Sequence, residues 1–121
     1  MSTEQNKAVI DRYFEAQNRH SLEDSFAFFS PNIISHSVPE QDGVVGIDGI
    51  KYFFSGFHDA VPDFKVTIHD TIAEGDKVVV RFTISGTQTK ELMGQPAGQP
   101  FVEHSLTIYR LEDSKIAEVW S

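Results

Sequence analysis

The chain has 121 residues, of which 40% are hydrophobic and ten are phenylalanine. This length and composition predict a single folded domain over residues 1–121 with a modest hydrophobic core. Eighteen acidic against ten basic residues give a formal net charge of −8, which disfavours nucleic acid and anionic membrane surfaces as partners.

Cysteine is absent from the sequence, which excludes disulfides, thiolate nucleophiles and cysteine-based metal sites. No apolar run approaches the length of a membrane span, and the N-terminus lacks the basic-then-apolar pattern of a signal peptide. We therefore expect a soluble cytoplasmic protein with no membrane partner.

The N-terminal third has the periodicity of helices. Ser2 and Gln5 have the spacing of a capping box, and apolar residues recur at helical spacing behind them, which predicts a helix over residues 3–19. Ser21 is expected to cap a short second helix, which ends at Pro31.

A short strand and a longer helix are expected next. Residues 32–38 are the strand candidate. The helix starts near Ile47 and is closed by Pro62, because one stripe between them is apolar. That stripe contains Ile47, Ile50, Phe54, Phe57 and Val61.

From Phe64 onward the hydrophobic period changes to two, which predicts strands. Turns are expected at residues 74–76 and 113–114, and an open loop rich in glycine and proline begins at Gly86. Helices followed by an antiparallel meander indicate an α+β domain.

Strand alternation places four ionisable residues on faces that also carry apolar side chains. His104 shares a face with Val102, Leu106 and Ile108, whereas Arg81 falls on the opposite side from the expected core. The other three ionisable residues are His36, Asp70 and Glu118. If these faces are the core faces, the ionisable groups line a cavity that water or a ligand enters, since burying such groups without partners is costly.

An ordered set of short motifs resembles the SnoaL-like polyketide cyclase family, within the nuclear transport factor two-like superfamily. The motifs are Asn32 to His36, Gly46 with Gly49-Ile50, Val61-Pro62-Asp63, Val78-Val79-Val80-Arg81, Gly86-Thr87, Gly94-Gln95-Pro96, Gly98, and Lys115-Ile116 with Glu118 and Trp120. The resemblance spans nearly the whole chain. It implies a cone-shaped, cystatin-like α+β fold in which a curved antiparallel sheet wraps helices around an apolar pocket, with the glycine-rich loop near its mouth.

The sequence departs from the family pattern at three places. Gln88 stands where the family commonly has a histidine. Val119, between Glu118 and Trp120, stands where the family commonly has a second histidine. The resemblance also implies an acid/base aspartate four residues beyond Trp120, whereas the sequence given ends at Ser121. We therefore expect ligand binding with slow or no turnover.

Two histidines are the candidate catalytic residues. His104 is either a general base or a hydrogen-bonded core histidine, and His36 has the same two interpretations. The candidate substrate-binding residues are Tyr13, Tyr52, Asp70, Gln88, Glu118 and Trp120. Alternatives remain open for several of them: the tyrosines as core residues, Asp70 at a bulge or strand end, and Glu118 paired with a histidine, Arg81 or Arg110.

Two functions fit these residues. The first is acid/base cyclisation or isomerisation of a small apolar, carbonyl-bearing substrate, and the second is non-catalytic binding of such a ligand. His36, His104 and Asp70 lack a metal-ligand spacing motif, so no metal and no other cofactor is expected. A homodimer is expected because the outer strand faces would carry Val79, Phe101 and Tyr109.

Overall fold

The computed structural model describes residues 2–36, 46–91 and 96–121. Within them the α+β class is confirmed. The elements in chain order are α1 (Thr3–Asn18), α2 (Leu22–Phe26), β1 (Phe29–Ser35), α3 (Ile47–Ala60), β2 (Lys65–Glu74), β3 (Lys77–Thr87), β4 (Pro100–Glu112) and β5 (Lys115–Trp120).

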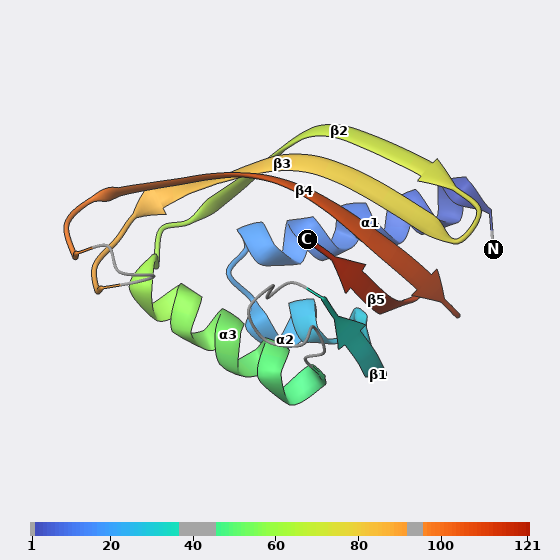
Figure 1. Cartoon of the computed structure of the whole chain (residues 1–121), viewed down its shortest axis with the longest axis horizontal. Coiled ribbons are helices and arrows are strands. Elements are labelled where there is room, and N and C mark those ends of the chain that lie inside the picture. The colour runs from blue at the N-terminus through green and yellow to red at the C-terminus, as the bar shows by residue number, and fades with distance from the viewer. Residues whose placement is uncertain (1, 37–45, 92–95) are drawn as a thin grey trace.

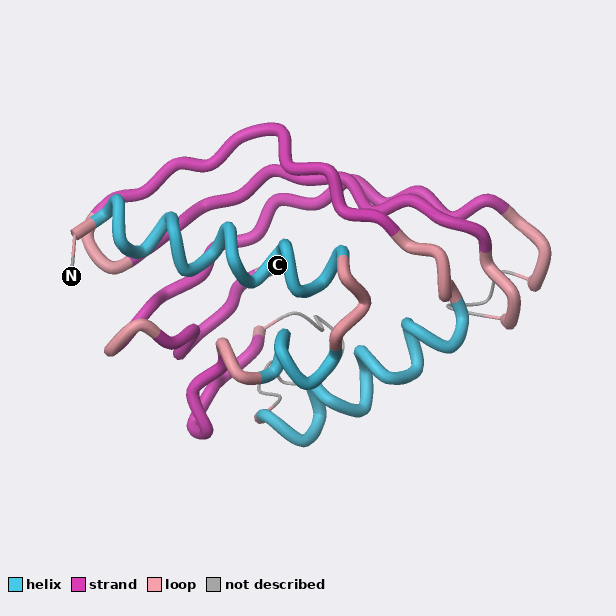
Figure 2. Tube along the Cα trace, turned by 180° about the vertical axis from the view of Figure 1, so that it is seen from behind, coloured by secondary structure: helices cyan, strands magenta, loops and turns pink. Residues whose placement is uncertain are grey.

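The five strands form one curved, unclosed sheet in the order β1-β5-β4-β3-β2. All three helices lie on the concave side of this sheet: α1 runs beneath β2 and β3, whereas α2 and α3 form a second wall further from it (Figures 1 and 2). Of the helices in the described part of the chain, none is long and apolar enough to cross a membrane.

Most strand pairs are antiparallel, as the sequence predicts, but one is not. β1 pairs with β5 in parallel, bringing Ile34 opposite Glu118 and Ser35 opposite Val119. β1 also begins at Phe29, three residues before the expected strand, and it runs through Pro31. Proline is tolerated there because β1 is an edge strand. Residues 37–38 of the expected strand lie outside the described residues.

The first helix begins as the sequence predicts. Ser2 Oγ accepts a hydrogen bond from the Gln5 backbone N–H over 3.1 Å, and Gln5 Oε1 accepts one from the Ser2 N–H over 2.9 Å. This capping box satisfies backbone donors that the helix itself cannot pair. The helix then buries one apolar face, formed by Val9, Ile10, Tyr13, Phe14 and Ala16. Burial of this face fixes α1 against the sheet.

His58 on α3 is half-buried. Its ring packs against Phe64 at 4.5 Å and lies 6.1 Å from the His20 ring. Its Nε2 is buried and has no hydrogen-bond partner among the described residues. Loss of hydration and the nearby His20 lower the pKa of His58 below its ordinary value of 6.5, although Asp59 partly offsets them.

This lowered pKa predicts a loss of stability in mild acid. Between the folded pKa of His58 and its ordinary value of 6.5, the unfolded chain binds more protons. The free energy of unfolding should therefore fall as the pH falls through that window. We expect His58→Gln to flatten this part of the profile, measured by urea unfolding at a series of pH values. Equal slopes for the two proteins would contradict the assignment.

Candidate functional site

A cavity of about 620 Å³ lies between the concave face of the sheet and the helices. Its wall is mainly aromatic, because α3 and the neighbouring elements turn their phenylalanines toward it. These residues are Phe14, Phe29, Phe53, Phe54, Phe57, Phe64 and Phe82. The volume lies within the range of small-molecule sites, about 300–1,000 Å³.

One strand supplies a row of polar residues to the cavity wall. Glu103, Ser105, Thr107 and Tyr109 of β4 all line it, since alternate residues of a strand point to the same face. At about 3.4 Å per residue, the row from Glu103 to Tyr109 spans about 20 Å. An elongated ligand would therefore meet polar groups along one edge and aromatic rings on its other side.

Two buried tyrosines lie at the Tyr109 end of this row. Their rings are 6.0 Å apart, and Gln17 Nε2 donates a hydrogen bond to Tyr13 Oη over 3.0 Å. Burial raises the pKa of both phenols; for Tyr109 the nearby Tyr13 adds to this effect, and a hydrogen bond with Thr107 opposes it. Both phenols therefore stay protonated at neutral pH. Each has an O–H to donate toward a ligand oxygen.

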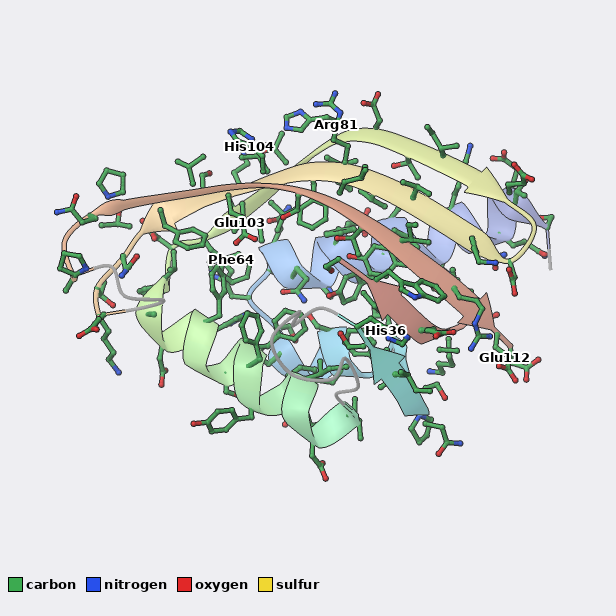
Figure 3. All side chains as sticks on the ribbon, viewed as in Figure 1. His36, Phe64, Arg81, Glu103, His104 and Glu112 are labelled. Atoms are coloured by element: carbon green, nitrogen blue, oxygen red, sulfur yellow. The ribbon has the colours of Figure 1, made fainter. Side chains whose placement is uncertain are left out.

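His104 does not face this cavity, so the prediction that it does is wrong. It lies on the convex side of the sheet, whereas its neighbour Glu103 points to the concave side (Figure 3). Thr83 Oγ1 lies 2.9 Å from His104 Nδ1 and 2.7 Å from His69 Nε2, which forms a polar row across three strands. His104 does share a face of β4 with Val102 and Leu106, as the alternation predicts. That face is the convex, outer one.

His36, Glu118 and Trp120 form a cluster of their own and are not among the residues that line the cavity. The His36 and Trp120 rings stack with centroids 5.4 Å apart, and His36 Nε2 lies 2.7 Å from Glu118 Oε2. Arg110 Nε donates to the other oxygen of Glu118 over 3.1 Å. The hydrogen bonds from His36 and then Arg110 lower the pKa of Glu118. This carboxylate therefore has two partners at once.

Asp70 and Gln88 also lie away from the cavity. Arg81 Nε donates to Asp70 Oδ2 over 2.7 Å, and both side chains are exposed. The expected position of Arg81, on the opposite side from the core, is confirmed. Gln88 is buried, and its backbone exchanges hydrogen bonds with Gln99 and Gly98 across the connection between β3 and β4. It supports the loop rather than the cavity.

Tyr13 and Tyr52 are the two predicted substrate-binding residues that do line the cavity. Tyr13 is buried in its wall, whereas Tyr52 is 84% exposed and lies at its rim. Sequence reasoning missed Glu103, Ser105 and Thr107. Their shared alternation with the aromatic residues Phe101 and Tyr109 was the signal that could have placed them on the inner face.

The described residues hold no group of three or more histidine, cysteine, aspartate or glutamate side chains that could bind a metal ion. The candidate set of His36, Asp70 and His104 is divided among three hydrogen-bonded groups: His36 with Glu118, Asp70 with Arg81, and His104 with Thr83. The ionisable and polar side chains that line the cavity instead are the Glu103 carboxylate, the Gln17 amide and the hydroxyls of serine, threonine and tyrosine residues. The chemistry available in the cavity is that of these groups.

The helices on the concave side of a curved, unclosed sheet define a nuclear transport factor two-like fold. The family model of the SnoaL-like polyketide cyclases matches residues 7–121, and the chain belongs to that family. No curated protein gives a significant match to the sequence.

Solved structures support the same assignment. AclR from Streptomyces galilaeus, a candidate hydroxylase, is 31% identical with a TM-score of 0.88, over 98% of this chain and 88% of that one. IdmH from Streptomyces antibioticus, a candidate polyketide cyclase, is 27% identical with a TM-score of 0.81, over 96% of this chain and 89% of that one. TsrD from Streptomyces laurentii is 26% identical with a TM-score of 0.83, over 99% of this chain and 88% of that one.

Proposed function

We propose that the cavity binds a small apolar ligand with a carbonyl group or fused rings and promotes its acid/base cyclisation or isomerisation. The observation that carries this proposal is the pairing of an aromatic wall with a single polar row on β4. A flat ligand buries its faces against the rings and directs its oxygens to the row. AclR is a candidate hydroxylase and IdmH a candidate polyketide cyclase, so the fold by itself does not choose between these activities.

The two buried phenols support the catalytic form of this proposal. Removing a proton next to a carbonyl group leaves negative charge on the carbonyl oxygen, and fixed O–H donors stabilise that charge in a site with little water. Tyr13 is suited to this role because Gln17 holds its oxygen and leaves its proton available. Tyr109 supplies a second donor from the sheet.

Non-catalytic binding of the same ligand is the second candidate function. It is favoured by one observation: neither His36 nor His104, the two expected catalytic residues, is among the residues that line the cavity. The volume and the aromatic wall suit binding equally well in both cases.

Filling the cavity tests the shared part of both functions. We expect Ser105→Trp to weaken the binding of 2-tetralone, a bicyclic aromatic ketone, by at least about tenfold, because the indole occupies the space beside the polar row. Ligand-observed NMR titration measures this. Glu112→Trp, an exposed residue of the same strand, is the matched control and should bind as the wild type does. Unchanged binding by Ser105→Trp would refute the cavity as the ligand site.

We also propose that the chain forms a homodimer through the convex face of the sheet. Phe101 and Tyr109, which the sequence interpretation placed on this face, are buried on the inner side. The apolar residues that are exposed instead are Ile72, Val102 and Leu106, at 63%, 61% and 62%. Exposed apolar residues that share one face of a sheet are typical of an interface, and closed two-fold dimers are the commonest oligomers. Light scattering should give twice the chain mass of 13.6 kDa.

A further inference from the structure

Glu103 is an ionisable residue whose side chain points to the concave, cavity side of the sheet. Along β4 the chain alternates between the two faces of the sheet, and Glu103 projects to the concave side (Figure 3). It lines the cavity together with Ile84, its partner on β3. An ionisable side chain in this position faces a largely aromatic wall.

The charge of Glu103 is also distinctive. Among the described residues that line the cavity it has the one acidic side chain, and no lysine, arginine or histidine accompanies it. None of the ion pairs formed by the described residues includes it. Its hydrogen-bond partner is Ser105, whose Oγ lies 3.5 Å from Glu103 Oε1. The carboxylate therefore has no cationic partner among the described residues.

The edge of the sheet next to Glu103 is open. β5 pairs with β4 from Ile108 onward, so residues 100–107 of β4 pair with β3 alone within the described chain. No described strand therefore separates Glu103 from the approach to the cavity along this edge. A ligand can reach the carboxylate without displacing part of the sheet.

From this arrangement we infer that Glu103 is the base that removes a carbon-bound proton from a neutral ketone or β-dicarbonyl ligand. This inference rests on the proposed function. In the step the C–H bond breaks, its proton forms an O–H bond with the carboxylate, and the electron pair moves onto the carbonyl oxygen as an enolate. Returning the proton to a different carbon of the conjugated enolate completes an isomerisation. In a cyclisation the enolate carbon attacks a second carbonyl group, whose oxygen becomes an alkoxide and takes the proton back from the Glu103 carboxyl group.

The same carboxylate selects against acidic ligands. Glu103 is exposed at the cavity, and a negative ligand there would lie beside an unpaired negative charge that repels it at short range. Neutral ketones should therefore bind better than carboxylic acids of the same shape. This selectivity gives a readout that does not depend on turnover.

The experiment measures binding and proton transfer separately. Exchange of the carbon-bound protons of 2-tetralone in D₂O is followed by NMR, and binding of 2-tetralone and of 2-naphthoate is measured by titration. We expect Glu103→Gln to slow the protein-dependent exchange by about 10²–10⁴-fold while leaving the Kd for 2-tetralone within about threefold. It should also strengthen 2-naphthoate binding by about tenfold.

Glu112→Gln is the matched control, because it makes the same chemical change on the same strand at an exposed position outside the cavity. It should leave both exchange and binding unchanged. Exchange by the wild type no faster than in buffer, or equally fast in Glu103→Gln, would overturn the inference while leaving ligand binding intact. Failure of the wild type to bind 2-tetralone would overturn the proposed function and this inference with it.

Discussion

Replacing Gly86 by alanine is expected to destabilise the protein by about 1–3 kcal/mol. A Cβ at this position would lie 2.5 Å from Val61 Cγ1, 2.9 Å from Asp63 Oδ1 and 3.1 Å from the Phe64 Cα. The last of these atoms is backbone, so it cannot rotate away. Gly86 therefore allows the end of β3 to pack directly against the segment that follows α3.

One of the crowded atoms, Asp63 Oδ1, also takes part in a hydrogen bond that ties β3 to the segment after α3. Asp63 Oδ1 accepts a hydrogen bond from the Thr87 backbone N–H over 2.7 Å, and this bond is the main cause of the lowered pKa of Asp63. Moving Asp63 to make room for a methyl group would lengthen that bond. The penalty then includes both steric strain and a weaker hydrogen bond.

Urea unfolding measures the effect, and a second glycine supplies the control. Gly56 lies within α3, and a Cβ there would meet nothing within 4 Å. Gly56→Ala should therefore stabilise the protein by about 0.5–1 kcal/mol, because glycine is unfavourable inside a helix. Equal stability of Gly86→Ala and the wild type would show that the close approach at Gly86 is not tight.

The elements of this fold could be predicted because their signals are local. The capping box at Ser2, the 3.6-residue period of α1 and the proline after α3, Pro62, all act within a few residues, and α1 and α3 match them closely. The parallel pairing of β1 with β5 could not be predicted in the same way. It joins residues more than eighty positions apart, and nothing in either strand specifies the direction of its partner.

The site was harder to predict because alternation shows which residues share a face, not which face is inside. On β4 the residues on the outer face are apolar, including Val102 and Leu106, whereas Glu103 and Ser105 on the inner face are polar. The usual rule that apolar residues point inward therefore selects the wrong face. It fails because the helices leave a cavity, and a cavity wall is not a packed core.

The sequence did suggest partners for Glu118, a histidine among them. Glu118 was expected to pair with a histidine or with an arginine, and it does both, through His36 and Arg110. The parallel register of β1 and β5 brings His36 and Glu118 together. This cluster is a consequence of sheet topology, which the sequence pattern does not contain.

Leu106→Glu is expected to convert the proposed homodimer to a monomer at micromolar concentration. Leu106 lies at the middle of the convex face, opposite Arg81 of β3, and is 62% exposed in the single chain. A carboxylate buried at an interface costs several kcal/mol unless a cation is available to it, and the neighbouring Arg81 is already paired with Asp70. We expect the dimer Kd to rise by about 30-fold or more, measured by sedimentation equilibrium.

The polar groups of the convex face explain why this surface can pair with a second copy. Asp70 is already paired with Arg81, and Thr83 already bridges His69 and His104, so covering the face leaves these groups with partners. Leu106→Glu should leave the fold intact, because the new side chain is exposed and next to Arg81 in the monomer. Ser55→Glu makes the same change in charge on α3, across the molecule from the convex face, and should leave the dimer unaffected. A monomeric wild type, or a Leu106→Glu variant with the wild-type dimer Kd, would exclude this face as the interface.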